Sequence, residues 1–243
     1  MSVRLEVDPR GIARIELDRP DRGNAMSREL LARFAEAIAQ VRADARVRVV
    51  VIRGNGKHFC TGADLRDGIP SMVSEAAGDP HALRRALRAV YTPFLSVLEV
   101  EVPTIASIQG SAIGGGLGLA LACDLRIVAD DAKLHANFAR LGIPPGMAIS
   151  YLLPRLVGPE RAAAMLFTGA PAIGRDAPAM GLAWRSVPLD ALATETDTLA
   201  ASIAEGAPEV ARIMKRSLRA DIGAVHRAAD EESLAQAFFL RGS

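Results

Sequence analysis

Three consecutive glycines, Gly114, Gly115 and Gly116, stand where an apolar helical run begins. Glycine costs a helix roughly 1 kcal/mol relative to alanine at each position, so three together indicate a need for exposed backbone. A helix N-terminus presents unpaired N–H groups and the positive end of the helix dipole, which suit a negatively charged atom. The glycines therefore predict a backbone anion site, with tight helix–strand packing as the equally weighted alternative.

The glycines fit the known nucleotide-binding loops poorly. A Walker loop requires the pattern GxxxxGK[ST], which the sequence does not contain. Gly114 and Gly116 supply the first half of a GxGxxG fingerprint, but Leu119 stands at its third position. No acidic residue follows about 20 residues later in a strand context, as the dinucleotide fold requires. A dinucleotide cofactor is therefore not expected.

A second loop of small residues, Gly62-Ala63-Asp64, comes after another apolar run, Val47–Ile52. In a parallel α/β layer, the loops after neighbouring strands lie at one end of the sheet, where ligands bind. We therefore expect the backbone N–H groups of Ala63 and Gly115 to converge on one oxygen. Such an oxyanion hole would suit a thioester carbonyl, with each donor worth roughly 3–4 kcal/mol.

The elements around these loops alternate between strand and helix patterns. Val3–Val7 and Ile12–Leu17 alternate like the two arms of a hairpin. A helix with Ser27 as its N-cap follows, and Val47–Ile52 is a continuous β-branched run typical of a buried parallel strand. His81–Leu98 is amphipathic with helical spacing. This order predicts an α/β fold.

The pattern becomes helical toward the C-terminus. A short helix is predicted over Ala177–Gly181, and longer ones over Leu189–Ala204, Pro208–Ala220 and Val225–Phe239. The change of composition near residue 188 predicts an α/β core over residues 1–188 and a helical region over residues 189–243.

Composition narrows the class of protein. The 29 basic and 28 acidic residues balance, which argues against general nucleic-acid or membrane-surface binding. Cys60 and Cys123 sit in apolar sequence without metal-ligand spacing, so we expect no metal and a reducing compartment. Neither a signal peptide nor a run of membrane-spanning length is visible, and we expect a cytoplasmic protein.

Four stretches, in order over residues 3–220, resemble the crotonase (enoyl-CoA hydratase/isomerase) superfamily. They are LDRPDRGNAMS, RVVVIRGNGKHFCTGADL, VPTIASIQGSAIGGGLGLALACDLRIVADDAKL and LGIPPGMAISYLLPRLVG. The resemblance implies a spiral of repeated ββα units and a helical C-terminal trimerisation region, here shorter than usual. It also implies a homotrimer or hexamer, and an acyl-CoA or acyl carrier protein thioester as ligand, with no other cofactor.

The resemblance also assigns residues to the site. It places the oxyanion-hole donors on Ala63 and Gly115, and it lines the bound pantetheine and adenine with Ala63, Asp64, Leu65 and Arg66. Basic side chains that could reach the phosphates are Lys57, His58 and Arg22, although exposed basic residues are more often simply solvated.

The usual acid/base positions of the family depart from its pattern. The two hydratase glutamates correspond to Gly118 and Phe138, and the carboxylate of some isomerases corresponds to Gly146. General acid–base catalysis needs a group of suitable pKa within hydrogen-bond reach, which none of these residues supplies. Water addition by the two-glutamate mechanism is therefore not expected.

Other side chains could substitute, but for each we favour a structural role. His135 lies near the expected pocket and is interpreted as a satisfied structural histidine. Asp64 suits turn capping, Asp124 begins a strand, and Cys60 is interpreted as a buried, inert thiol.

A further basic cluster lies on the helix that roofs the pocket in relatives. It consists of Arg84, Arg85 and Arg88, for which solvent exposure is the default and contact with a carboxylate or phosphate the alternative.

The turn Pro145-Gly146-Met147 resembles the crotonase-like decarboxylases of polyketide β-branching, which also lack the glutamates. Three functions stay open on the sequence: a lyase or isomerase that stabilises a thioester enolate with an unidentified acid or base, a decarboxylase of an acyl thioester, and a non-catalytic acyl-CoA-binding module. Loss of carbon dioxide needs little beyond the hole, because the leaving group supplies the electrons.

Overall fold

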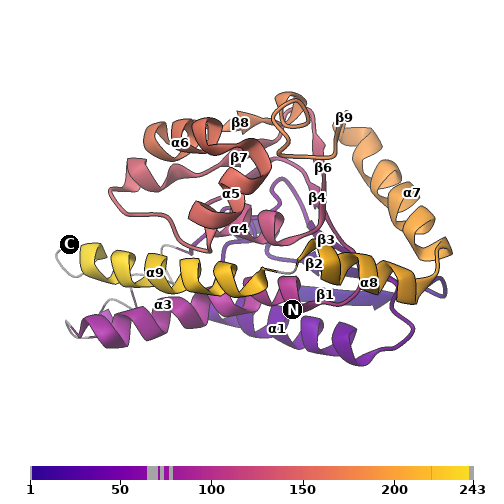
Figure 1. Cartoon of the computed structure of the whole chain (residues 1–243), viewed down its shortest axis with the longest axis horizontal. Coiled ribbons are helices and arrows are strands. Elements are labelled where there is room, and N and C mark those ends of the chain that lie inside the picture. Colours follow the sequence, from indigo (N-terminus) through magenta and orange to yellow (C-terminus); the bar gives the residue numbers. More distant parts are fainter. Residues whose placement is uncertain (1, 65–70, 72–73, 77–78, 220, 241–243) are drawn as a thin grey trace.

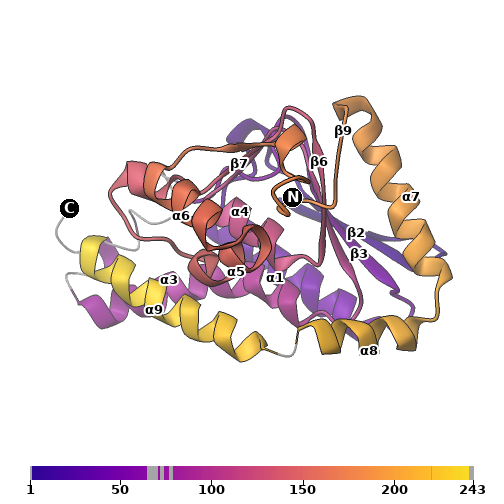
Figure 2. The same ribbon diagram turned by 45° about the horizontal axis from the view of Figure 1, so that its top comes forward.

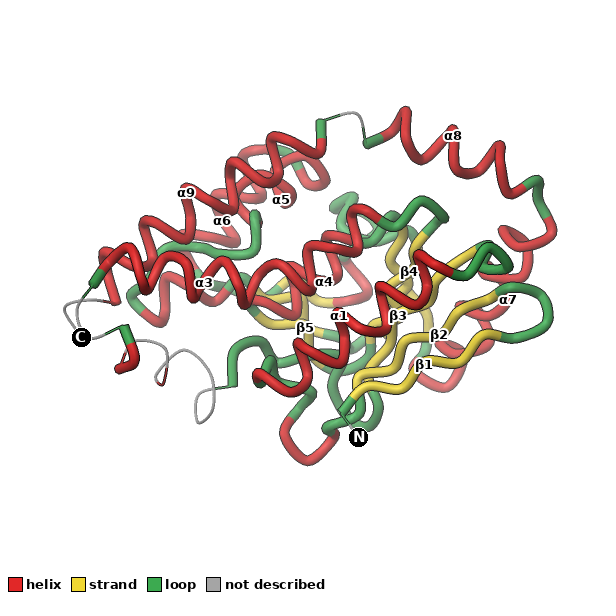
Figure 3. Tube along the Cα trace, turned by 90° about the horizontal axis from the view of Figure 1, so that it is seen from below, coloured by secondary structure: helices red, strands yellow, loops and turns green. Residues whose placement is uncertain are grey.

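The computed structural model describes residues 2–64, 71, 74–76, 79–219 and 221–240 (Figure 1). Its main sheet has six strands in the order β1-β2-β3-β4-β6-β9, of which β1 to β4 are seen side by side in Figure 3. Their bounds are β1 Val3–Val7, β2 Ile12–Leu17, β3 Val49–Gly54, β4 Thr104–Ile108, β6 Leu125–Ala129 and β9 Arg185–Val187. β1 and β2 form the expected antiparallel hairpin, and every later pairing in this sheet is parallel.

The two faces of β3 explain why its sequence is apolar throughout. Val50 and Ile52 join the large core that includes α1 (Arg28–Ala43) and α3 (Pro80–Leu95). Val49 and Val51 point to the other face, where they pack in a smaller core with residues of α7. A parallel strand covered on both sides has no polar face, as the continuous β-branched run predicted.

A second, three-stranded sheet has the order β5-β7-β8. It contains β5 Ser111–Ile113, β7 Lys133–His135 and β8 Ala172–Ile173. β5 runs directly into α4 (Gly115–Ala122), and the sequence analysis did not identify it as a strand. A three-residue strand is too short to show alternation, so the pattern did not reveal it.

The remaining elements are mostly helical. They are α5 Ile149–Val157, α6 Pro159–Thr168, α7 Leu192–Glu205, α8 Pro208–Leu218 and α9 Ile222–Leu240, with short 3₁₀ turns at Pro20–Arg22, Ser96–Glu99, Asn137–Leu141, Gly174–Asp176 and Leu189–Ala191. The helix predicted over Ala177–Gly181 is wrong. That stretch forms turns, in which Gly181 N–H donates to Pro178 O and Leu182 N–H donates to Ala177 O.

The α/β class is confirmed. From residue 189 the described elements are all helical, and α9 runs alongside α3 and also touches α5 (Figures 1 and 2). None of the helices in the described part of the chain is long and apolar enough to cross a bilayer.

Candidate functional site

Backbone hydrogen bonds bring the loop of residues 60–64 against the start of α4. Cys60 N–H donates to Ser111 O at 3.1 Å, and Ile113 N–H donates to Cys60 O at 3.0 Å. Gly62 has φ +88°, and a Cβ built on it would lie 2.6 Å from Ile113 O and 3.5 Å from Gly115 N. Only glycine permits this conformation and this approach together. The two loops that the sequence singled out are therefore direct neighbours.

The start of α4 is built from backbone alone. Gly114 has φ +50° and its N–H donates to His135 O at 2.9 Å. A Cβ on Gly116 would overlap Cys60 O, so glycine is required there too. Among the described residues, neither Ala63 N–H nor Gly115 N–H has a hydrogen-bond acceptor. Two unpaired donors on adjoining loops are what an oxyanion hole requires.

Apolar side chains lie around the start of α4. The Met26 Sδ atom lies so close to Gly115 that a Cβ there would overlap it. The nearest atom of the Phe138 ring would be 3.8 Å from a Cβ on Gly114, and Met147 Cγ would be 3.8 Å from one on Gly115. Met26, Phe138 and Met147 are all buried. Apolar walls lower the local dielectric and so strengthen the electrostatic effect of the N–H groups.

None of the three positions that the sequence resemblance assigns to acid/base residues, Gly118, Phe138 and Gly146, contains a carboxylate in this chain, and other side chains crowd the two glycines. A Cβ on Gly118 would overlap Cβ of Met147, so even alanine does not fit without movement. A Cβ on Gly146 would lie 2.5 Å from the Tyr91 hydroxyl and 3.0 Å from Gln236 Nε2. Packed side chains rather than open space therefore lie where a longer side chain at Gly118 or Gly146 would extend.

The turn before α5 holds a group that the sequence analysis missed. Met147 and Ala148 have φ +65° and +56°, which is rare for residues other than glycine. The Glu232 carboxylate on α9 accepts hydrogen bonds from Ala148 N–H at 2.5 Å and from Ser150 N–H at 2.8 Å. The Ser150 hydroxyl donates to the same carboxylate at 2.5 Å. Two buried polar residues four apart, Glu232 and Gln236, on an otherwise apolar face of α9 were the available signal.

A second contact between helices supports the same turn. The Tyr91 hydroxyl on α3 donates to Gln236 Oε1, and Gln236 Nε2 donates to Pro144 O at 2.9 Å. Burial raises the pKa of the Tyr91 hydroxyl, so it remains a neutral donor. Burial also raises the pKa of Glu232, against the hydrogen bonds of Ser150 and Ala148.

The side chains assigned structural roles make structural contacts. His135 Nε2 lies 2.5 Å from Gly169 O at the end of α6, and the backbone carbonyl of His135 accepts a hydrogen bond from Gly114 N–H. The Asp64 carboxylate pairs with Arg19 Nη1 at 3.2 Å. Burial raises the pKa of the Cys60 thiol to about 12, which keeps it protonated and unreactive.

The proposed phosphate contacts lie on two loops that pack together. Asn24 Nδ2 donates to His58 O at 2.7 Å and to Asn55 O at 3.0 Å, which joins the loop of Arg22 to that of Lys57. The Arg22 and Lys57 side chains are exposed. Burial and the charge of Lys57 lower the pKa of His58, which favours its neutral form. Leu65 and Arg66, assigned to the pantetheine and adenine, lie outside the described residues.

The basic cluster on α3 is only partly free. Arg88 Nε pairs with Asp230 on α9 at 2.7 Å, and Arg85 lies 4.0 Å from Asp79. A hollow of about 320 Å³ lies beside this cluster. Its lining consists of His81, Arg84, Arg85, Arg88 and Asp230.

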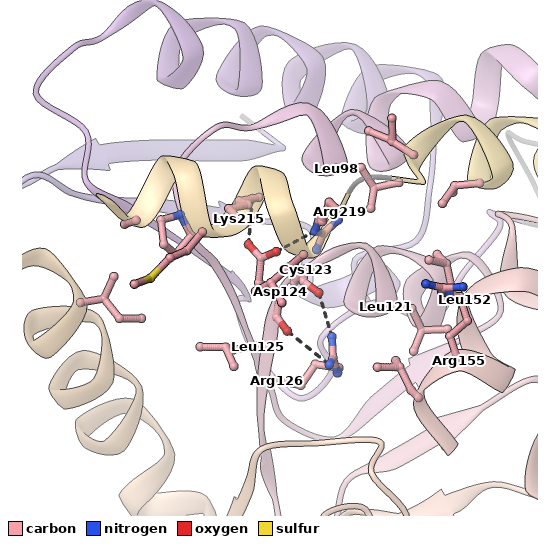
Figure 4. Close-up of a pocket in the computed structure, with 18 of the residues that line it drawn as sticks. Leu98, Leu121, Cys123, Asp124, Leu125, Arg126, Leu152, Arg155, Lys215 and Arg219 are labelled. Atoms are coloured by element: carbon pink, nitrogen blue, oxygen red, sulfur yellow. Dashed lines mark hydrogen bonds and ion pairs between the residues drawn. The ribbon is translucent and has the colours of Figure 1, made fainter. Parts of the chain in front are cut away.

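A separate cavity of about 760 Å³ lies under α8 (Figure 4). On one wall, Asp124 pairs with Lys215 Nζ at 2.8 Å and with Arg219 Nε at 2.7 Å. Burial would raise the pKa of Asp124, but these two charges outweigh it and the pKa is lowered. Neither Ala63 nor Gly115 lines this cavity, and Asp124 acts as the anchor of α8.

The family model described as enoyl-CoA hydratase/isomerase matches residues 8–238. The chain is 39% identical to the probable enoyl-CoA hydratase EchA14 of Mycobacterium tuberculosis over 218 residues, which covers 90% of this chain and 81% of that one. It is 34% identical to a putative enoyl-CoA hydratase of Thermus thermophilus over 221 residues, or 89% of this chain and 83% of that one.

Solved structures of proteins described as enoyl-CoA hydratases are also similar to this chain. The crystal structure of a probable enoyl-CoA hydratase from Mycobacterium thermoresistibile covers 100% of both chains, with a TM-score of 0.85 and 30% identity. The enoyl-CoA hydratase from Bacillus anthracis covers 96% of this chain and 90% of that one, with a TM-score of 0.82 and 31% identity. The crotonase-type fold expected from the sequence is confirmed.

Proposed function

Because the chain belongs to the enoyl-CoA hydratase/isomerase family, we propose that it binds an acyl-CoA or acyl carrier protein thioester, with the carbonyl oxygen between Ala63 N–H and Gly115 N–H. The observation that carries this proposal is the pair of unpaired donors on adjoining loops. Both donors are held by backbone conformations that only glycine neighbours allow, so the site is formed before the ligand arrives.

The reaction that this site favours is decarboxylation of a carboxylated acyl thioester. The bond between the acyl chain and the carboxylate breaks, and its electron pair moves onto the carbonyl oxygen to give a thioester enolate and carbon dioxide. A proton, delivered through water, then returns to carbon. The hole stabilises the enolate oxygen, and the buried apolar side chains of Met26, Phe138 and Met147 lower the dielectric around it.

Two-glutamate hydration does not fit the site. It requires a carboxylate at positions now held by Gly118 and Phe138, and Met147 packs where the first would extend. For the rest of the ligand, we place the pantetheine and adenine along Ala63, Asp64, Leu65 and Arg66, and the phosphates near the exposed side chains of Arg22 and Lys57.

One assay tests the function. The protein is incubated separately with crotonyl-CoA and with a glutaconyl-type CoA thioester, and the products are followed by mass. We expect loss of carbon dioxide from the second thioester and no water addition to the first. Crotonyl-CoA turnover at an ordinary hydratase rate would overturn the argument from Gly118 and Phe138. Binding without turnover of either thioester would instead identify a non-catalytic acyl-CoA-binding module.

We further propose a homotrimer, or a hexamer of two trimers, located in the cytoplasm. The buried, unpaired thiols of Cys60 and Cys123 support a reducing compartment. The apolar surface of α8 supports assembly.

A further inference from the structure

We propose that Glu232 on α9 is a positioning residue for the thioester site, acting through the left-handed turn at Met147 and Ala148. This inference rests on the proposed function, because the turn matters to the ligand only if the ligand lies at Ala63 and Gly115. It assigns to the C-terminal helix a role that neither the family match nor the sequence pattern provides.

The turn needs an external support. Met147 and Ala148 both have positive φ, a conformation in which the Cβ of an L-residue crowds its own backbone. Residues of this kind persist only where the surroundings hold them in place. Both are buried, at 2% and 0% exposure, so water cannot satisfy their backbone groups.

The Glu232 carboxylate provides that support. It accepts the N–H of Ala148 inside the turn and both the N–H and the hydroxyl of Ser150 just after it. These donors lie at the start of α5, where N–H groups have no partner within the helix. Glu232 is itself only 6% exposed, so these hydrogen bonds are shielded from competition by water. One side chain of α9 thus accepts hydrogen bonds from both Ala148 and Ser150.

The left-handed turn determines where the Met147 side chain lies beside the site. Met147 lies against Gly118, where a Cβ would overlap its own, and Met147 Cγ is 3.8 Å from a Cβ built on Gly115. If the turn relaxed to negative φ, the direction of the Met147 side chain would change, and Gly115 would lose one of its two apolar neighbours, the other being Met26. The position of Met147 beside the hole therefore depends on a carboxylate in α9.

A double-mutant cycle tests the inference, with acetoacetyl-CoA as the probe and its Kd measured by calorimetry. We expect Glu232→Gln to raise the Kd about tenfold, because an amide cannot accept from all three donors. In an Ala148→Gly background the same change should raise the Kd less than about threefold, because glycine adopts positive φ without support. Ser233→Ala is the matched control, since that buried hydroxyl donates only to Asp230 O of its own helix.

The outcomes separate a positioning role from a purely structural one. If Glu232 only stabilised the fold, Glu232→Gln would lower the melting temperature and leave the Kd of the folded protein unchanged, which would overturn the inference. An equal rise of Kd in both backgrounds would also overturn it, because the effect would not pass through the turn.

Failure of the proposed function can be recognised separately. If the wild type does not bind acetoacetyl-CoA, the thioester site and the positioning role toward it are both wrong. Hydrogen exchange then still tests the turn itself. Glu232→Gln should accelerate exchange at the Ala148 and Ser150 amides and Ser233→Ala should not, and unchanged protection would show that the carboxylate does not hold the turn.

Discussion

At the scale of single residues, the candidate hole depends on glycines that let one backbone touch another. We expect Gly62→Ala to cost roughly 3 kcal/mol, from positive φ together with the overlap of its Cβ with Ile113 O. Gly142→Ala is the matched control: its φ is also positive, at +68°, but its Cβ would meet nothing within 4 Å, so about 1 kcal/mol is expected. Urea unfolding of both variants measures the difference, and equal costs would show that the close approach is unimportant.

The contact between Gly118 and Met147 makes a second prediction. In the parent, Gly118→Ala should destabilise the protein by about 1–3 kcal/mol, because the new methyl group overlaps Met147 Cβ. In a Met147→Gly background that methyl group has room, and the helix preference for alanine should make the same change stabilising by up to about 1 kcal/mol. Unfolding free energies of the four proteins test this reversal of sign, and a penalty of the same size in both backgrounds would contradict it.

Some of these residues could be predicted from the sequence because they lie in a local motif. Others could not, because their roles depend on contacts between distant parts of the chain. The loss of the carboxylate at Gly118 could be predicted, because it follows from one position in a recognisable motif. Met147 could not be identified as the side chain that fills the space, since nothing local marks two distant residues as touching. Glu232 was missed in the same way, because its donors are backbone N–H groups of a turn far away in the chain.

At the scale of elements, α8 is attached to the body of the protein by charge more than by apolar packing. Lys215 is its one buried side chain among the residues that the structure describes, and it pairs with Asp124 beside Arg219. Lys215 Nζ also donates to Val102 O at 2.8 Å. Removing Asp124 would leave two largely buried cations without a counter-ion, a situation that costs about 3–5 kcal/mol.

This anchor predicts a pH dependence. The folded-state pKa of Asp124 is lowered, so the stability it contributes is complete above its unfolded value of about 4 and is lost as the pH falls through the folded value. The wild type should therefore exceed Asp124→Asn in unfolding free energy at pH 7, and the gap should close below about pH 4. Glu36→Gln, which breaks an exposed pair with Arg33, is the control. A gap that does not change with pH would show that the carboxylate charge is not the cause.

Helices and strands with strong patterns were predictable, whereas short elements were not. The hairpin, the buried β3 and the long helices could be predicted because each is long enough to show its pattern of apolar residues. That pattern has a period of two residues in a strand and 3.6 in a helix. β5 and the turns at Ala177–Gly181 extend over too few residues to show a period. Hydrogen bonds to the distant Cys60 hold β5, whereas the turns close through local hydrogen bonds. The strand that leads into the candidate hole, β5, could therefore not be predicted from the sequence pattern.

At the scale of the whole molecule, α8 carries an apolar surface that the described part of the chain leaves exposed. Ile213, Met214 and Leu218 are 59%, 60% and 84% exposed, and the last two line the cavity of about 760 Å³ beneath the helix (Figure 4). Exposed apolar side chains that cluster beside a cavity are typical of a surface that another protein covers. A further copy of this chain is the occupant that the trimer proposal requires.

Assembly through α8 can be tested by changing Leu218. The wild type should elute as a trimer or hexamer in size-exclusion chromatography with light scattering, and Leu218→Glu should shift it to monomers, because a buried interface would have to desolvate the new charge. Leu218→Met keeps the apolar surface and should preserve the assembly. The anchor of α8 on Asp124 lies within the chain, so Leu218→Glu monomers should keep the wild-type circular dichroism. A monomeric wild type, or a Leu218→Glu protein that still assembles, would place the interface elsewhere or remove it.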